Sequence, residues 1–180
     1  MIINIVLISF IVFLLIVLTM VWPPDSPWSP WWRTNRKVAR AACKLAGISS
    51  SDEVFELGSG DGTFLLTASQ EFGAKCTGIE IDHSRFFISK LNILFNRGRN
   101  IKLIRSNFYS VNLSPATIVF VYLVPRALGR LAPKLLKELK VGTKIISYRY
   151  KFPKDVVNNK INLSHHDKKN NIFVYEIKSK

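Results

Sequence analysis

The sequence predicts an α/β fold: a doubly wound, mostly parallel sheet preceded by one apolar helix. Three observations predict it. Short β-rich runs alternate with helical runs from residue 53 onward, a glycine-rich turn follows the first of these runs, and residues 1–22 are almost entirely apolar. An alternation of strands and helices is typical of a parallel sheet whose two faces are covered by helices.

The N-terminal segment has the length and composition of a membrane span. Residues 2–22 carry no charge, and Asn4, Ser9 and Thr19 are their only polar interruptions. As a helix the run would extend roughly 31 Å at about 1.5 Å per residue, close to the thickness of a bilayer's hydrocarbon core. It lacks the positive start and small-residue cleavage site of a signal peptide, and a buried core helix would not be apolar all round. We therefore expect a transmembrane anchor over 1–22.

A Pro/Trp-rich juxtamembrane linker is expected over 23–33, ahead of a domain over 34–180. Lys and Arg follow the apolar run and none precedes it, so the positive-inside rule predicts a single-pass protein with the rest of the chain on the cytoplasmic side. In a eukaryote the inner mitochondrial membrane is the equivalent expectation. The net charge of +14 favours an anionic neighbour, either a lipid surface or nucleic acid.

The domain is expected to begin with a helix over 34–46, with Thr34 as its N-cap and Gly47 just past its end. Between the fourth and fifth strands we expect a short turn over 126–131 and then a helix from Pro133 to Lys140, because proline inside a helix would break it. The remaining predicted elements are strands at 53–57, 75–81, 101–106, 116–123 and 143–152, helices at 63–72 and 84–97, and an antiparallel edge pair at 156–163 and 171–178.

The glycine-rich turn, Gly-Ser-Gly-Asp-Gly at 58–62, joins a strand to a helix, as a cofactor loop does at the carboxyl edge of a doubly wound sheet. Thr63 stands where a dinucleotide fingerprint has its third glycine, and the Gly-Lys-Ser/Thr of a P-loop is missing. Glu56 and Asp61 would repel a pyrophosphate and favour a ligand with positive charge. S-adenosylmethionine, with its ammonium and sulfonium groups, is such a ligand. The alternative is an ordinary strand–helix turn.

Further candidate cofactor contacts follow the next two strands. Glu80 ends the second strand, 22 residues after Gly58, where a carboxylate can accept hydrogen bonds from both ribose hydroxyls. After the third strand, Asn107 could read the adenine and Phe108 could cover it. The alternative roles are a solvated strand end for Glu80 and Asp82, a loop amide for Asn107 and a core ring for Phe108. The candidate cofactor-binding residues are Glu56, Gly58, Ser59, Gly60, Asp61, Gly62, Glu80, Ile81, Asp82, Asn107 and Phe108.

The segments "VFELGSGDGTF" and "GIEID" resemble motif I and the acidic second-strand end of class I S-adenosylmethionine-dependent methyltransferases, which have a Rossmann-like sheet. With "PWSP", "VFVYLVP" and "GTKIISYRYKFP", the chain resembles the membrane-anchored protein-lysine methyltransferases of the ATP synthase c subunit and adenine nucleotide translocase type. The resemblance implies that "PWSP" helps to close the active site. Asn107 and Trp31 depart from the pattern, replacing an acid and a small hydroxyl residue. Implied cofactor contacts are Glu56, Gly58, Gly60, Asp61, Glu80 and Asn107.

The candidate acceptor site is aromatic. The fourth strand ends in "YLVP" (122–125) and lacks the Asn/Asp-Pro-Pro-aromatic turn of enzymes that methylate base nitrogens or glutamine, which disfavours nucleic acid as the substrate. An apolar cleft would lower the pKa of an acceptor lysine, and ring faces can hold the methylated cation. Tyr148, Tyr150 and Phe152 alternate on one face of the last central strand, so packing is the alternative role there. The candidate catalytic residues are Trp28, Tyr122, Pro125 and Tyr148.

No metal is expected, because Cys43, Cys76 and the three histidines show no ligand spacing. The leading hypothesis is a protein-lysine N-methyltransferase that uses S-adenosylmethionine and acts on a membrane-associated protein. The alternatives are methylation of a lipid, a quinone or another small molecule, and a non-catalytic membrane-attached adaptor with the same fold. A nucleic-acid enzyme is a further alternative.

Overall fold

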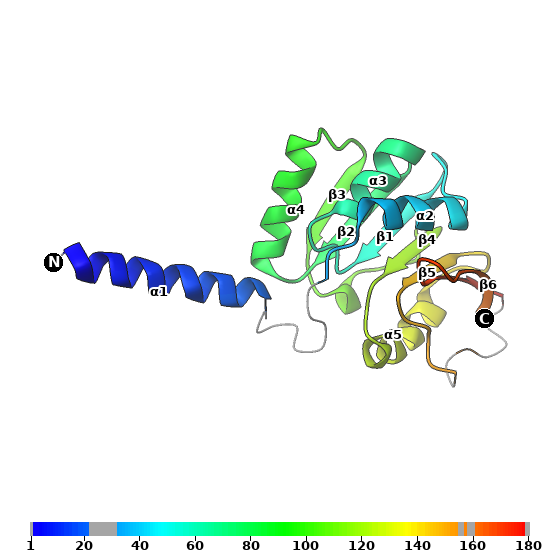
Figure 1. The fold of residues 1–180 in the computed structure, drawn as a ribbon. Coiled ribbons are helices and arrows are strands. Elements are labelled where there is room, and N and C mark those ends of the chain that lie inside the picture. The colour runs from blue at the N-terminus through cyan, green and yellow to red at the C-terminus, as the bar shows by residue number, and fades with distance from the viewer. Residues whose placement is uncertain (1, 22–31, 155–156, 158–160, 179–180) are drawn as a thin grey trace.

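The computed structural model describes residues 2–21, 32–154, 157 and 161–178, with side chains in the first helix described over 2–18 (Figure 1). Seven strands form one sheet in the order β3-β2-β1-β4-β5-β7-β6. The first five strands pair in parallel, and β7 is antiparallel to both of its neighbours. The strands are β1 (Glu53–Leu57), β2 (Lys75–Glu80), β3 (Ile101–Arg105), β4 (Ile118–Val121), β5 (Lys144–Tyr148), β6 (Ile161–Asp167) and β7 (Ile172–Ile177).

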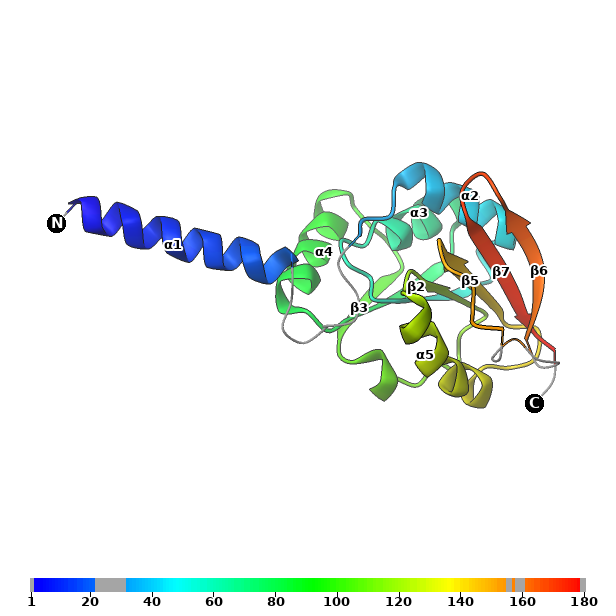
Figure 2. The same ribbon diagram turned by 60° about the horizontal axis from the view of Figure 1, so that its bottom comes forward.

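Helices cover both faces of this sheet, as the sequence predicts (Figure 2). Side chains of β1 alternate between two cores: Val54 packs with α2 and α3, whereas Phe55 and Leu57 pack with α5. The first and fourth strands lie side by side although β2 and β3 intervene in the chain, so the strand order reverses between them. The helices are α1 (Ile2–Val21), α2 (Arg36–Ala46), α3 (Thr63–Phe72), α4 (His83–Phe95), the 3₁₀ turn η1 (Phe108–Ser110) and α5 (Pro125–Glu138).

The N-terminal apolar run forms helix α1, but the predicted membrane span is not found. Within the described part of the chain, no helix is both long and apolar enough to cross a membrane. The predicted single-pass membrane location is therefore wrong. The expectation of a membrane-associated substrate depended on that anchor, whereas the lipid surface, which the net charge of +14 also favours, stays a prediction.

Helix α2 differs from the prediction at its first residue. Asn35, and not Thr34, is the N-cap, because its Oδ1 accepts a hydrogen bond of 2.8 Å from the Lys37 N–H. Thr34 is buried and lies one residue earlier. The predicted end is confirmed, since Gly47 adopts a left-handed conformation with φ of 68° and its N–H bonds back to Cys43 and Lys44.

Helix α5 corrects the prediction of a turn followed by a short helix. One helix runs from Pro125 to Glu138 and contains Pro133 in its interior. Pro125 occupies the first turn, where a missing N–H costs nothing, and it starts the helix eight residues earlier than expected. Pro133 lacks the N–H that would bond to the carbonyl of Gly129, four residues earlier, so the helix forgoes one hydrogen bond there. Burial of Leu128, Leu131 and Leu135 in the core stabilises the continuous helix.

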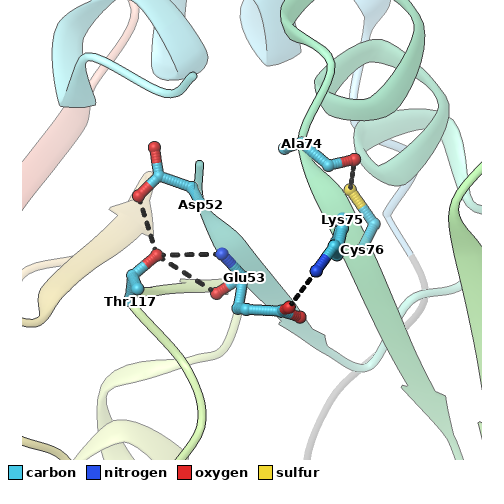
Figure 3. Close-up of polar contacts among 6 residues, drawn as sticks. All are labelled: Asp52, Glu53, Ala74, Lys75, Cys76 and Thr117. Atoms are coloured by element: carbon cyan, nitrogen blue, oxygen red, sulfur yellow. Dashed lines mark hydrogen bonds and ion pairs between the residues drawn. The ribbon is translucent and has the colours of Figure 1, made fainter. Parts of the chain in front are cut away.

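The amino edge of the sheet carries a closed polar network (Figure 3). The Glu53 N–H donates to Thr117 Oγ1 at 3.0 Å, and that hydroxyl donates to Asp52 Oδ1 at 2.7 Å. The Glu53 carboxylate accepts from Lys75 Nζ at 3.2 Å, which links the starts of β1 and β2. Each acid drawn in this network thus has a donor from a neighbouring strand or loop. The opposite, carboxyl edge differs, and the candidate site lies there.

Candidate functional site

A cleft opens at the carboxyl ends of β1, β2 and β4, beside the point where the strand order reverses. Ligands of open α/β sheets bind in this position. The segment just before α2 contributes Trp32, Arg33 and Thr34 to one wall. Nine of the residues that the sequence predicts as functional line the cleft: Glu56, Gly58, Ser59, Gly60, Asp61, Glu80, Ile81, Phe108 and Tyr122.

The glycine turn leaves backbone accessible at one position and packs tightly at another. Gly58 has φ of 80°, and a Cβ built on it would meet nothing within 4 Å, so a ligand can approach the backbone there. A Cβ on Gly62 would instead lie 2.6 Å from Ser89 Oγ, and φ is 74°. Gly62 does not line the cleft and serves close packing of α3 on α4. The turn therefore combines a ligand-facing glycine with a structural one.

Both carboxylate oxygens of Glu80 are held by backbone N–H groups. Its side chain is buried, Oε2 accepts from the Gly60 N–H at 2.9 Å, and Oε1 accepts from the Asp82 N–H at 3.0 Å. Burial raises the pKa of Glu80, and these two hydrogen bonds partly offset the rise. Each oxygen keeps a lone pair beyond the one used by the backbone. The carboxylate is thus oriented and can still accept hydrogen bonds from a ligand.

Glu56 is buried without full satisfaction of its carboxylate. It is 4% exposed, and Oε2 has no hydrogen-bond partner. Burial raises the pKa of Glu56 well above its ordinary value, and the nearby charges of Asp61 and Glu80 raise it further. A buried, unpaired carboxylate oxygen is costly to a folded chain unless a ligand supplies the missing partner. A cationic group in the cleft would supply it.

Asp61 already has partners within the chain. Its Oδ2 accepts from Arg33 Nε at 2.7 Å, and its Oδ1 accepts from the Thr63 N–H at 3.1 Å, at the first turn of α3. Asn92 Nδ2 donates to the backbone carbonyl of Asp61 at 2.8 Å. Its negative charge is therefore balanced by Arg33, so the preference for a cationic ligand depends on Glu56 and Glu80.

Several predicted residues lie outside the cleft lining. Asp82 Oδ1 caps α4 by accepting from the Arg85 N–H at 2.8 Å, and Asn107 Oδ1 caps η1 by accepting from the Tyr109 N–H at 3.0 Å. Pro125 is an exposed first-turn residue of α5. Trp28 lies outside the described residues. Both side chains thus cap the element that follows them, and their roles as cofactor contacts stay predictions.

An aromatic pair lies at the ends of β4 and β5: Tyr122 follows β4 and lines the cleft, whereas Tyr148, the last residue of β5, lies outside the cleft lining. The rings of Tyr122 and Tyr148 meet edge to face at 4.5 Å. Arg149 Nη1 donates to Tyr122 Oη at 3.0 Å, and the guanidinium carbon lies 5.6 Å from the centre of the Trp32 ring. Burial raises the pKa of Tyr122, whereas the Arg149 hydrogen bond lowers it.

The prediction that Tyr148, Tyr150 and Phe152 share one face of a strand is wrong. Strand β5 ends at Tyr148, and Arg149 turns the chain with φ of 72°. Tyr148 packs with Tyr122 against the core of α2 and α3, whereas Tyr150 and Phe152 pack on the α5 side. A positive φ in a residue other than glycine interrupts the alternation that the sequence suggests.

The structure adds cleft residues that the sequence does not indicate. Arg85 is buried in α4 beside Glu80 and Asp82; burial lowers the pKa of its guanidinium, against their charges. Phe64 stacks on Phe120 at 3.8 Å below the cleft. Arg85 follows Asp82 by three residues, and this spacing places its side chain about one helical turn from that acid. Among the described residues no cluster of His, Cys, Asp and Glu could hold a metal ion.

The donor set of the cleft fits S-adenosylmethionine. The open backbone at Gly58 can accommodate its methionyl part, the unsatisfied Glu56 carboxylate matches an ammonium group, and Glu80 can accept from ribose hydroxyls. A doubly wound sheet with such a cleft defines a class I S-adenosylmethionine-dependent methyltransferase.

Solved structures show the same fold. An RNA methyltransferase from Salinibacter ruber, in complex with S-adenosyl-L-homocysteine, superposes with a TM-score of 0.75 at 24% identity, covering 83% of this chain and 95% of that one. A methyltransferase from Pyrococcus furiosus superposes with a TM-score of 0.66 at 16% identity, covering 82% and 84%. At these identities the likeness concerns the fold.

The sequence comparisons place the chain more closely. Residues 56–158 match the ANTKMT methyltransferase domain. A relative from Saccharolobus islandicus (strain REY15A), named protein-lysine N-methyltransferase, is 36% identical over 138 residues, which are 73% of this chain and 85% of the relative. The chain belongs to the family of the ANTKMT methyltransferase domain, and it is an S-adenosylmethionine-dependent methyltransferase.

Proposed function

We propose that this protein methylates the Nζ atom of lysine side chains in a protein substrate. The observation that carries the proposal is an acidic cofactor cleft bordered by an aromatic wall, in which Tyr122 lines the cleft and Tyr148 supports it by an edge contact between the rings at 4.5 Å. The wall offers ring faces and a hydroxyl, which suit an aliphatic amine, and no amide or carboxylate follows β4 to bind a base edge. The name of the Saccharolobus islandicus relative supports the same acceptor.

The cofactor would be held mainly by the first two strand ends. Glu80 accepts from the ribose hydroxyls, Glu56 receives the ammonium group, and the backbone from Gly58 to Gly60 lies against the methionyl part. Ile81 and Phe108, both in the cleft lining, cover the adenine. The buried carboxylates also keep phosphorylated nucleotides out, because their charge repels phosphate.

The acceptor side must deliver a neutral amine. When bound, S-adenosylmethionine supplies an electrophilic methyl group, whose carbon–sulfur electron pair passes to sulfur as the acceptor nitrogen's lone pair forms the new bond. The protein's work is to align that nitrogen and exclude water. The apolar rings of Tyr122 and Tyr148 favour the uncharged amine by desolvation, and their faces can hold the methylated product.

The test is to incubate the purified protein with methyl-labelled S-adenosylmethionine and a native cell extract, and to locate the label by mass spectrometry. We expect methyl-lysine in one or a few proteins, and none with Glu80→Ala. Glu53→Ala, which removes an acid at the amino edge, is the matched control and should label normally. Label confined to lipid or RNA, with none in protein, would contradict the proposal.

A further inference from the structure

Arg149, the residue that follows β5, has an unusual backbone conformation. Its φ is 72°, in the left-handed region that side-chain-bearing residues rarely adopt. Its N–H donates to the carbonyl of Asn171 at 2.7 Å, immediately before β7, so the edge hairpin fixes this conformation. Backbone strain of this kind persists where the surrounding structure enforces it, and it gathers at functional sites.

The left-handed turn directs the Arg149 side chain toward the cleft. Nη1 donates to Tyr122 Oη at 3.0 Å, and the guanidinium lies over the Trp32 ring at 5.6 Å. Both partners line the cleft that holds the cofactor residues. The exposed guanidinium of Arg149 is therefore held by two contacts, with Tyr122 and Trp32, beside the cleft.

The chemistry of this contact is directional. Arginine only donates hydrogen bonds, so Tyr122 Oη is the acceptor and its own proton points elsewhere. The hydroxyl oxygen keeps a further lone pair, which can accept an N–H from an amine. A second positive charge beside the guanidinium is disfavoured, so an ammonium loses its proton to solvent water more readily there.

We propose that Arg149 is a positioning residue for the acceptor: it holds the Tyr122 hydroxyl at the aromatic wall, and its fixed charge favours the neutral lysine amine over the ammonium. The inference rests on the proposed lysine methylation and identifies the residue that keeps the acceptor amine uncharged. It explains why a strained arginine, and not a glycine, occupies the turn.

Other charged and titratable groups face the same cleft and set the background. The carboxylates on the cofactor side would favour an ammonium. Arg33 pairs with one of them, that of Asp61. Arg149 acts from the opposite side, next to two further tyrosines. The groups concerned are Glu56, Asp61, Glu80, Arg33 and Arg85 in the cleft, with Tyr148 and Tyr150 beside Tyr122.

The experiment measures kcat against pH with saturating S-adenosylmethionine and a lysine-containing protein acceptor, for which core histones serve as the probe. Arg149→Gln keeps a polar N–H donor on a shorter side chain and removes the charge. We expect its acidic limb to move upward by about one pH unit, with kcat about tenfold lower at pH 7 and recovering near pH 9. Arg149→Lys should restore much of the wild-type profile.

The controls separate this role from a structural one. Lys102→Gln removes an exposed charge from β3 and should leave the profile unchanged. Tyr122→Phe combined with Arg149→Gln should lose little more than the worse single variant, because the two residues act as one unit. Cofactor affinity, measured by calorimetry, should be the same in Arg149→Gln and wild type.

Equal loss of kcat at every pH, or an unchanged profile in Arg149→Gln, would overturn the proposal. Methyl groups found on a residue other than lysine in the wild-type reaction would overturn the proposed function and this inference with it. The two failures are distinguishable, since the first is seen only in the variant and the second already in the wild-type product.

Discussion

The two edges of the sheet treat their acidic residues in opposite ways. At the amino edge, Asp52 and Glu53 are exposed or half-buried, and each accepts a hydrogen bond from a neighbouring element (Figure 3). At the carboxyl edge, Glu56 and Glu80 are buried, burial raises their pKa values, and Glu56 Oε2 has no partner. Only two residues of β1 separate Glu53 from Glu56.

The difference shows which end of one strand stabilises the fold and which end is kept ready for a ligand. A closed polar network contributes modestly to stability and needs nothing more. A buried carboxylate oxygen without a hydrogen-bond partner destabilises the folded chain, and binding of a cation lowers that cost. The predictions below test this contrast, from the largest expected effect to the smallest.

Glu80→Ala should weaken S-adenosylmethionine binding about a hundredfold or more, because it removes an oriented, buried acceptor and leaves the Gly60 and Asp82 N–H groups without it. Calorimetric titration measures the loss. Glu53→Ala at the other edge is the control and should bind as the wild type does. Similar affinities in both variants would show that the two edges do not differ as described.

Glu56→Gln should weaken cofactor binding about tenfold and at the same time raise the thermal midpoint of the cofactor-free protein by a few degrees. The amide keeps the shape of the side chain and removes a buried charge whose Oε2 lacks a partner. Thermal unfolding with and without cofactor measures both effects. A lower midpoint in the cofactor-free variant would contradict this interpretation of Glu56.

The same residue gives a pH dependence with opposite signs for stability and binding. The folded-state pKa of Glu56 lies above its ordinary value of 4.5, so the folded chain holds more protons than the unfolded chain between the two values. The free energy of unfolding should therefore fall as pH rises through that window. Cofactor affinity should rise over the same window, because the ionised carboxylate binds the cation. Both trends should shrink in Glu56→Gln.

Arg33→Gln should weaken cofactor binding about threefold. The ion pair with Asp61 joins the segment before α2 to the glycine turn at 2.7 Å, but the Arg33 side chain is 68% exposed, so solvent screens the pair. The effect should shrink further at 1 M salt. Lys37→Gln, on the exposed start of α2, is the matched control for lost positive charge.

Thr117→Val should leave cofactor affinity unchanged and cost about 1 kcal/mol of stability, because valine keeps the shape but cannot bond to Glu53 and Asp52. Chemical denaturation measures the loss. A change in affinity in this variant would mean that the amino edge communicates with the cleft.

Periodicity and turn chemistry were sufficient to predict most of the sheet. Strand β1 and helix α3 begin and end where the sequence predicts, since a buried apolar run, three glycines and Gly73 delimit them. Helix α5 was not predicted correctly, because the rule against interior proline outweighed the buried leucines that hold that helix together. Local patterns thus predict elements well until tertiary packing overrides them.

The cofactor half of the cleft was more predictable than the acceptor half. Glu56, Gly58 and Glu80 fall at strand ends, where the topology itself brings side chains together. The Arg33–Asp61 pair joins residues 28 apart, and the contact of Arg149 with Tyr122 depends on a left-handed residue. Neither long-range pairing nor a positive φ in arginine has a signature in a single sequence.

The late place of β7 in the chain has a consequence for biosynthesis. The cofactor half is complete once β4 has been made, but β5 pairs with β7, and Asn171 fixes the turn at Arg149. A nascent polypeptide emerging from the ribosome can therefore assemble its cofactor pocket some fifty residues before its acceptor wall exists. On the proposed function, methyl transfer therefore requires translation to pass Ile177.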